Sequence, residues 1–270
     1  MTTSRRAFLA AVAAAAAASS ACSSPKDEPL AAPGTTASGG AGGTPSRPSS
    51  PTAGPAPSGI EGTPRAAQPD LVHGPRDRAA VALTFHGAGD ARLARRVLTL
   101  AAEAHAGLTI LAVGTWLDET PALAREILDA GHDLGNHTWS HLPMRRLSRQ
   151  EADREVSRAA TLIQRLTGSH GSWFRPSGTP RSTARIRGAA IASGYPRCLA
   201  YDVDPLDYTD PGSSAVTRRL LAQVRPGSIV SLHLGHLGTV DALPGIFQGL
   251  AQRSLRPVTM TSLMSGAARS

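Results

Sequence analysis

Several residues that can carry out acid–base or metal chemistry stand directly after short apolar runs in this chain. The clearest group is His137-Thr138-Trp139-Ser140-His141, whose two histidines are four positions apart. Two histidines at this spacing can face one metal ion. Because Thr rather than Glu follows the first histidine, the segment is not the helical signature of zinc proteases. The spacing alone leaves open whether His137 and His141 are metal ligands or ordinary surface or core histidines.

Other reactive side chains follow the remaining apolar runs, which we predict to be strands. His86 follows the first run, Arg175 ends the fourth, Asp207 comes after the fifth and His233 follows the sixth. In barrels of alternating strands and helices, chemistry takes place at the carboxyl ends of the strands. This placement predicts that the side chains share one site.

The elements that must position these residues alternate along the chain. Helices are expected at 92–104, at 121–130 and, after the capping box that Ser148 opens, at 149–167 with Gly168 at its end. Such alternation is typical of a parallel sheet built from βα units, and seven strands in about 200 residues favour a small, incomplete (β/α) barrel. The predicted strands are Val81–Phe85, Leu108–Val113, His132–Gly135, Ser172–Arg175, Cys198–Tyr201, Ile229–Leu232 and Val258–Thr259.

The first 67 residues have a different composition from the rest. Residues 1–22 predict a twin-arginine lipoprotein signal, because Arg5 and Arg6 precede an alanine-rich run that ends at Cys22. A lipid on Cys22 would anchor the chain, and the alternative is a soluble protein cleaved near Ala21. Residues 23–67 are rich in Ser, Pro and Gly and predict a disordered linker before a domain at 68–270.

Charge and cysteine content narrow the possible partners. The formal net charge is +8, but no Lys/Arg run is interleaved with aromatic residues, so nucleic acid is not an expected partner. A basic surface favours anionic partners such as cell-wall polymers. If Cys22 carries a lipid, Cys198 has no disulfide partner within the chain and is expected to be a buried structural thiol.

Four segments occur in the order and spacing of a known enzyme family. Residues 131–141 resemble the metal-binding block of carbohydrate esterase family 4, the polysaccharide deacetylases with the NodB homology domain. Residues 174–178 resemble the family's Arg-Pro-Pro-Tyr-Gly block, residues 204–208 resemble Asp-x-x-Asp-Trp, and residues 229–233 resemble the strand that ends in the catalytic histidine. The resemblance covers about residues 79–264.

The resemblance implies a deformed barrel and metal-dependent hydrolysis of N-acetyl groups on sugar polymers. In the family a divalent metal, often zinc, is held by two His and one Asp, and it polarises the amide carbonyl and activates a water. By position, His233 corresponds to the acid that protonates the leaving amine. Arg175, paired with Asp207, corresponds to the group that orients or tunes the base.

The first motif departs from the family pattern. Where the family has Thr-Phe-Asp-Asp-Gly, with the base first and the metal ligand second, this chain has Thr84-Phe85-His86-Gly87. Two arrangements could replace the missing carboxylates. In the first, His86 is the base and Asp90 turns back to bind the metal; we favour it because an anionic ligand offsets the metal's charge. In the second arrangement, His86, His137 and His141 bind the metal and Asp90 is the base.

Three functions remain open from the sequence. The first is a metal-dependent deacetylase of cell-wall glycan, with peptidoglycan as the expected polymer because of the membrane tether. The second is a glycan-binding lipoprotein that keeps the fold without catalysis, and the third is a related amide hydrolase for another acyl group. In each case we expect an exported monomer on the outer face of the cytoplasmic membrane, held by the lipid on Cys22.

Overall fold

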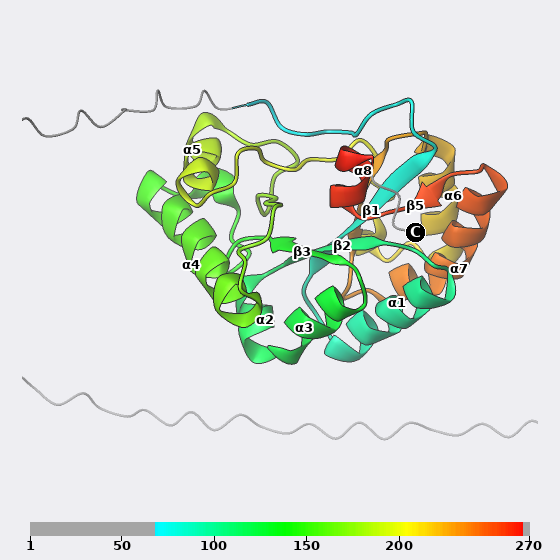
Figure 1. Cartoon of the computed structure of the whole chain (residues 1–270), viewed down its shortest axis with the longest axis horizontal. Coiled ribbons are helices and arrows are strands. Elements are labelled where there is room, and N and C mark those ends of the chain that lie inside the picture. Colours follow the sequence, from blue (N-terminus) through cyan, green and yellow to red (C-terminus); the bar gives the residue numbers. More distant parts are fainter. Residues whose placement is uncertain (1–67, 267–270) are drawn as a thin grey trace, which may run out of the picture. The chain divides into compact units, whose positions relative to one another are not determined.

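The computed structural model describes residues 68–266, which form a parallel sheet covered by helices (Figure 1). The strands follow the order β3-β2-β1-β4, and β5 pairs with the start of β1. Their apolar runs are nearly continuous because both faces of the sheet are covered. The strand bounds are Ala80–Gly87 (β1), Leu108–Ala112 (β2), Asp133–Asn136 (β3), Ile229–His233 (β4) and Arg256–Pro257 (β5).

Single parallel bridges complete the ring that the sheet begins. Phe174 bridges both Asn136 of β3 and Cys198, and Val203 bridges Val230 of β4. The fourth and fifth predicted strands are thus bridges rather than full strands, and the last strand lies at residues 256–257 instead of 258–259. The mixed α/β fold with a parallel sheet is confirmed, and the bridges give it the character of a deformed barrel.

The helices begin and end close to their predicted bounds. Ser148 and Glu151 form the predicted capping box, and Gly168 ends that helix with a φ of 85°. Among residues 68–266, no helix combines the length and apolarity that crossing a membrane requires. The helices are α1 (Ala91–Glu103), α2 (Gly114–Glu119), α3 (Ala122–Asp129), α4 (Arg149–Thr167), α5 (Ala184–Ala192), α6 (Ser213–Gln223), α7 (Leu237–Gln252) and α8 (Met260–Ser265), with 3₁₀ turns at Met144–Arg146 and Asp207–Thr209.

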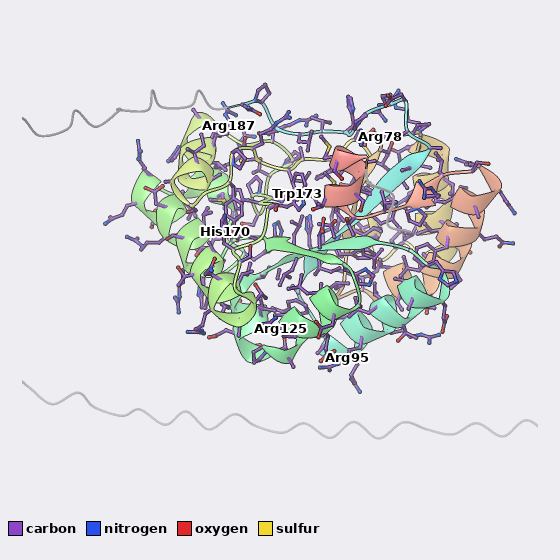
Figure 2. The ribbon with its side chains drawn as sticks, viewed as in Figure 1. Arg78, Arg95, Arg125, His170, Trp173 and Arg187 are labelled. Atoms are coloured by element: carbon purple, nitrogen blue, oxygen red, sulfur yellow. The ribbon has the colours of Figure 1, made fainter. Side chains whose placement is uncertain are left out.

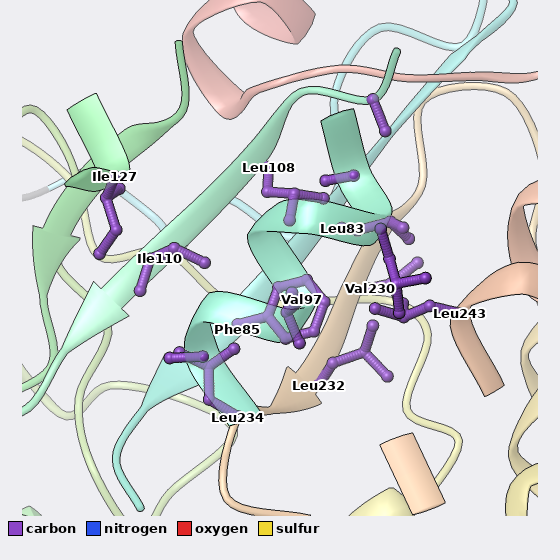
Figure 3. Close-up of a cluster of buried hydrophobic side chains, with 14 of the residues drawn as sticks. Leu83, Phe85, Val97, Leu108, Ile110, Ile127, Val230, Leu232, Leu234 and Leu243 are labelled. Atoms are coloured by element: carbon purple, nitrogen blue, oxygen red, sulfur yellow. The ribbon is translucent and has the colours of Figure 1, made fainter. Parts of the chain in front are cut away.

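Strand β1 divides its side chains between the core and the interior of the ring. Leu83 and Phe85 are fully buried and pack with Val97 of α1 and Leu243 of α7 (Figure 3). Burying one such side chain contributes about 1.5–3 kcal/mol. Because alternate residues of a strand face opposite sides, Thr84 and His86 lie on the other face, toward the interior. The core therefore fixes the direction in which His86 projects.

Positive charge is spread over the outer helices. Arg95 and Arg125 project from α1 and α3 (Figure 2), and Arg95 forms an ion pair of 2.8 Å with Glu126 of α3. Exposed pairs of this kind contribute about 0–1 kcal/mol, so these arginines set the surface charge more than they stabilise the fold.

The predicted N-terminal signal, the predicted lipid on Cys22 and the predicted linker at 23–67 lie outside the described residues. Within them, Cys198 is buried and unpaired, as expected, and burial raises the pKa of its thiol to about 12. A thiol with so high a pKa is rarely ionised at neutral pH and is a poor nucleophile.

Candidate active site

The candidate site is built at the carboxyl ends of neighbouring strands. His86 of β1 stands opposite His233 of β4 in the parallel register, two residues beyond the pair Thr84 and Ser231 and on the same face. The ring centroids of the two histidines are 4.3 Å apart. His137 directly follows β3, and its backbone N–H donates to the carbonyl of Ala112 at the end of β2. Strand register thus brings together histidines that are distant in sequence.

Three histidines form a compact cluster of possible ligands. The ligand nitrogens of His86, His137 and His141 lie within 4.8 Å of one another, and Nε2 of His137 is 3.1 Å from Nε2 of His141. The Nδ1 of His137 lies 2.9 Å from the carbonyl oxygen of Arg175 and donates a hydrogen bond to it in the tautomer that leaves Nε2 free. These are the ligands of the second arrangement that the sequence left open, the metal site of three histidines.

Burial favours the neutral form of His86 and His137 strongly, and that of the more exposed His141 less. Desolvation lowers the pKa of His86 and of His137 well below 6.5, and it also lowers the pKa of His141. The positive charge of a neighbouring protonated histidine or of Arg175 acts in the same direction. A neutral imidazole is the form that binds metal, so the donor set suits a divalent ion with three nitrogen ligands and an open position.

These shifts predict how stability depends on pH in the metal-free protein. In the unfolded chain the three histidines take up protons near pH 6.5, whereas in the folded chain they do so only at lower pH. The unfolded state then binds more protons, so the free energy of unfolding is expected to fall as pH drops below about 6.5. Thermal melts with chelator between pH 7.5 and pH 5 measure this slope. The slope should shrink in a His86→Asn variant, and an equal slope in that variant would contradict the assignment.

Asp90 does not join the cluster. Its side chain accepts a hydrogen bond of 2.8 Å from the N–H of Arg92 as the N-cap of α1, and it forms an ion pair of 2.7 Å with the Arg92 guanidinium. The arrangement that we favoured from the sequence, with Asp90 as a metal ligand, is therefore not the one that the structure shows. The physical reason is that an Asp directly before a helix satisfies the helix's free N–H groups.

The surroundings of Gly87 are also tight, and a side chain there would require its neighbours to shift by a few tenths of an ångström. A Cβ at Gly87 would lie 3.0 Å from Cα of Ala112 and 3.0 Å from Cζ3 of Trp116. The loop that follows is also close-packed, because a Cβ at Gly89 would lie 2.5 Å from Cα of Gly235. The freedom expected of this glycine-rich loop is thus restricted by its neighbours.

Asp207 pairs with His233 rather than with Arg175, which corrects the prediction. The fully buried carboxylate of Asp207 accepts hydrogen bonds from Nδ1 of His233 at 2.8 Å, from the His233 N–H at 2.8 Å and from the Thr239 hydroxyl at 2.6 Å. This fixes the His233 tautomer and leaves Nε2 as the ring nitrogen available to a substrate.

Arg175 is buried without a carboxylate partner among the described residues. Its Nη2 donates to the Thr84 hydroxyl at 2.8 Å and to the Ala200 carbonyl at 3.1 Å, while Nε and Nη1 have no hydrogen-bond partner. Desolvation lowers its pKa to about 9. Thr84 shares its strand face with His86, so the guanidinium lies beside the position where the family pattern has a carboxylate.

A carboxylate at position 86 should therefore stabilise the protein. We expect His86→Asp to raise the free energy of unfolding by up to about 3 kcal/mol, because loss of one partner from a buried ion pair costs about 3–5 kcal/mol. Denaturant unfolding of the metal-free protein measures the change. His86→Asn is the matched control, since it has the same shape without the charge. Equal stability of the two variants would contradict the prediction.

The site opens into a cavity of about 260 Å³. Its walls include His86, His141, Arg175, Tyr201, Tyr208 and His233. A larger hollow of about 890 Å³, lined mainly by the ends of α1 and α7 and by the segment around β5, contains none of the predicted site residues. The smaller cavity is the one that two of the possible metal ligands, His86 and His141, share with His233.

Sequence reasoning missed Tyr201, Tyr208 and Glu155. Tyr208 packs its ring 5.2 Å from the ring of His233, and it stands where the family block has Trp, which was the available signal. Glu155 accepts hydrogen bonds from the loop that carries His141. In the sequence, Glu155 is one of several charged residues in a long helix, so no pattern distinguished it from the others.

Comparison with known proteins agrees with this geometry. A family model described as polysaccharide deacetylase matches residues 73–196. A peptidoglycan-N-acetylglucosamine deacetylase of Bacillus cereus is 27% identical over 194 residues, which cover 70% of each chain. A solved peptidoglycan N-acetylglucosamine deacetylase superposes with a TM-score of 0.67 at 25% identity, over 74% of this chain and 94% of that one.

The fold also occurs without activity. A pseudoenzyme of carbohydrate esterase family 4 from Bacillus anthracis superposes with a TM-score of 0.67 at 24% identity, over 72% of this chain and 68% of that one. This similarity concerns the fold alone. The family model, the relatives and the ordered sequence blocks together lead to one conclusion: residues 73–196 match the polysaccharide deacetylase family.

Proposed function

We propose that this protein is a metal-dependent hydrolase that removes N-acetyl groups from the amino-sugar polymers of the cell wall, with peptidoglycan as substrate. The observation that carries the proposal is the cluster of three histidines beside a cavity that His86 and His141 share with His233, the histidine paired with Asp207. The names of the relatives, which include peptidoglycan deacetylases, support the choice of polymer.

His86, His137 and His141 would hold the metal, and zinc fits their three nitrogens and an open position. When bound, a divalent ion polarises an amide carbonyl and lowers the pKa of a water. This assignment replaces Asp90 as a ligand with His86, because the Asp90 carboxylate is engaged at the start of α1.

His233 is the residue that moves protons. Its Nε2 faces no competing hydrogen-bond partner among the described residues, and Asp207 stabilises the imidazolium that forms when Nε2 takes a proton from the attacking water. His233 then returns the proton to the leaving nitrogen of the sugar. Because His86 is assigned to the metal and is no longer available as the base, the His233–Asp207 pair serves as both base and acid.

One experiment tests the function. Metal content is measured in the purified full-length chain, and acetate release is measured with peptidoglycan and with chitin oligomers as substrates. We expect about one zinc per chain and acetate from peptidoglycan. Metal binding without acetate from either polymer would contradict the proposal.

A second candidate is a glycan-binding protein without catalysis. It is favoured by the loss of both carboxylates of the first motif, at His86 and Gly87, and by the tight packing around Gly87. Retention on insoluble peptidoglycan together with no acetate release would support this candidate over the enzyme.

We further propose that the chain is exported and held at the outer face of the membrane by a lipid on Cys22. The arginine pair and the apolar run before Cys22 support this. A Cys22→Ala variant is expected to leave the membrane fraction and appear in the soluble fraction, as judged by fractionation of cells. If the variant stays in the membrane fraction, another anchor is present.

A further inference from the structure

The loop that carries His141 has an unusual backbone. Thr138 has a φ of 71° and His141 has a φ of 57°, which place both residues in the left-handed region. Residues other than glycine occupy this region at a cost of roughly 1–2 kcal/mol each, so bonds from outside the loop must hold them there. The orientation of His141 therefore depends on whatever fixes this loop.

Glu155 of α4 supplies such bonds. One carboxylate oxygen, Oε2, accepts hydrogen bonds from the backbone N–H of Trp139 at 3.1 Å and of Ser140 at 2.9 Å. The other, Oε1, accepts from the Ser140 hydroxyl at 2.6 Å. All three donors lie in the two residues before His141. Hydrogen bonds to a carboxylate are about twice as strong as neutral ones. These three bonds therefore fix the backbone of the two residues that precede His141, the proposed metal ligand.

Besides its bonds to the loop, Glu155 carries a negative charge that opposes the lowering of the His141 pKa by burial. The residue is only 9% exposed, and within residues 68–266 it forms no ion pair with Lys, Arg or His. A carboxylate buried without a cation is retained only where hydrogen bonds compensate it. Here the compensation comes from the loop alone, so the carboxylate and the loop conformation stabilise each other.

Two further contacts tie the same loop to α4. Asn136 accepts a hydrogen bond from the Thr138 N–H at 2.8 Å and donates to the Val156 carbonyl at 2.9 Å. The guanidinium of Arg158 lies 3.7 Å above the centre of the Trp139 ring. Helix α4 thus holds the loop at both ends, and Glu155 makes the contacts nearest to His141.

We propose that Glu155 is a positioning residue that holds His141 in the orientation required for metal binding. This inference rests on the proposed metal site of His86, His137 and His141. Glu155 does not touch the metal or the substrate. It acts through the backbone of Trp139 and Ser140, and its effect should therefore vanish when the His141 side chain is absent.

The test is a double-mutant cycle of metal affinity. Zinc affinity is measured by competition with a chromophoric chelator in the parent, Glu155→Gln, His141→Ala and the double variant. We expect Glu155→Gln to weaken zinc binding tenfold to a hundredfold, as is common for groups that orient ligands. In the His141→Ala background the same change should have no further effect.

Glu151→Gln is the matched control, because it makes the same chemical change on the same helix at the exposed capping box. It should leave zinc affinity unchanged. If Glu155→Gln fails to fold, Ser140→Ala removes only the hydroxyl donor to Oε1, and we expect a several-fold weaker affinity from it.

The outcomes separate this inference from the proposed function. A parent that binds no zinc overturns both. A parent that binds zinc, with Glu155→Gln or its Ser140→Ala substitute at parental affinity, overturns only the role of Glu155. An equal loss from Glu155→Gln with and without His141 would show general destabilisation and would also overturn it.

Discussion

A variant in which His137 and His141 are both replaced by alanine is expected to lose its metal and its deacetylase activity. The two Nε2 atoms lie 3.1 Å apart, and the variant keeps only His86 of the clustered ligands. A single imidazole cannot hold a divalent ion at the affinity of a three-ligand site, so bound zinc should fall from about one per chain to near zero. Metal analysis after dialysis measures this, and acetate release should fall with it.

The control for this variant is His170→Ala. His170 contacts the ring of Tyr195 and belongs to no ligand cluster of the described residues (Figure 2). It should leave zinc content unchanged. Circular dichroism must show that the double variant is folded, since removal of buried side chains also costs stability. Parental zinc content in the folded double variant would rule out the site.

Asp207→Asn is expected to lower kcat by roughly a thousandfold to ten-thousandfold with little change in KM, which is the scale found when a carboxylate behind a catalytic histidine is neutralised. The amide keeps the shape but removes the charge that stabilises protonated His233. It also replaces one acceptor with an N–H₂ group. In the Oδ1 position this group deprives the His233 ring of its acceptor, and in the Oδ2 position it deprives both the His233 N–H and the Thr239 hydroxyl.

The chain supplies a close control for this change. Asp210 pairs with His236 at 2.8 Å, the same distance as between Asp207 and His233, but the Asp210 side chain is 67% exposed. Asp210→Asn should therefore leave kcat within about twofold of the parent, because solvent screens an exposed pair. A kcat for Asp207→Asn equal to that of Asp210→Asn would show that His233 does not carry the proton.

The sequence by itself placed three of the helices, the main strands of the sheet and several candidate site residues at strand ends. Periodic apolar residues, the Ser148 capping box and Gly168 are local signals, and they placed α4 correctly. His86 and His233 were placed at strand ends from the pattern alone, because apolar runs end where strands leave the core. The short spacing of His137 and His141 likewise kept them together, since a few residues of loop cannot separate them far.

Only the tertiary structure decided what each carboxylate does. Asp90 could reach a metal or cap α1, and the close approach of Gly89 to Gly235 together with the ion pair to Arg92 settles that it caps. Asp207 was expected beside Arg175 but lies beside His233, because pairing depends on side-chain direction across the ring and not on order in the chain. Glu155 became visible only when α4 was packed against the loop before His141, since hydrogen bonds between segments far apart in sequence leave no periodic pattern.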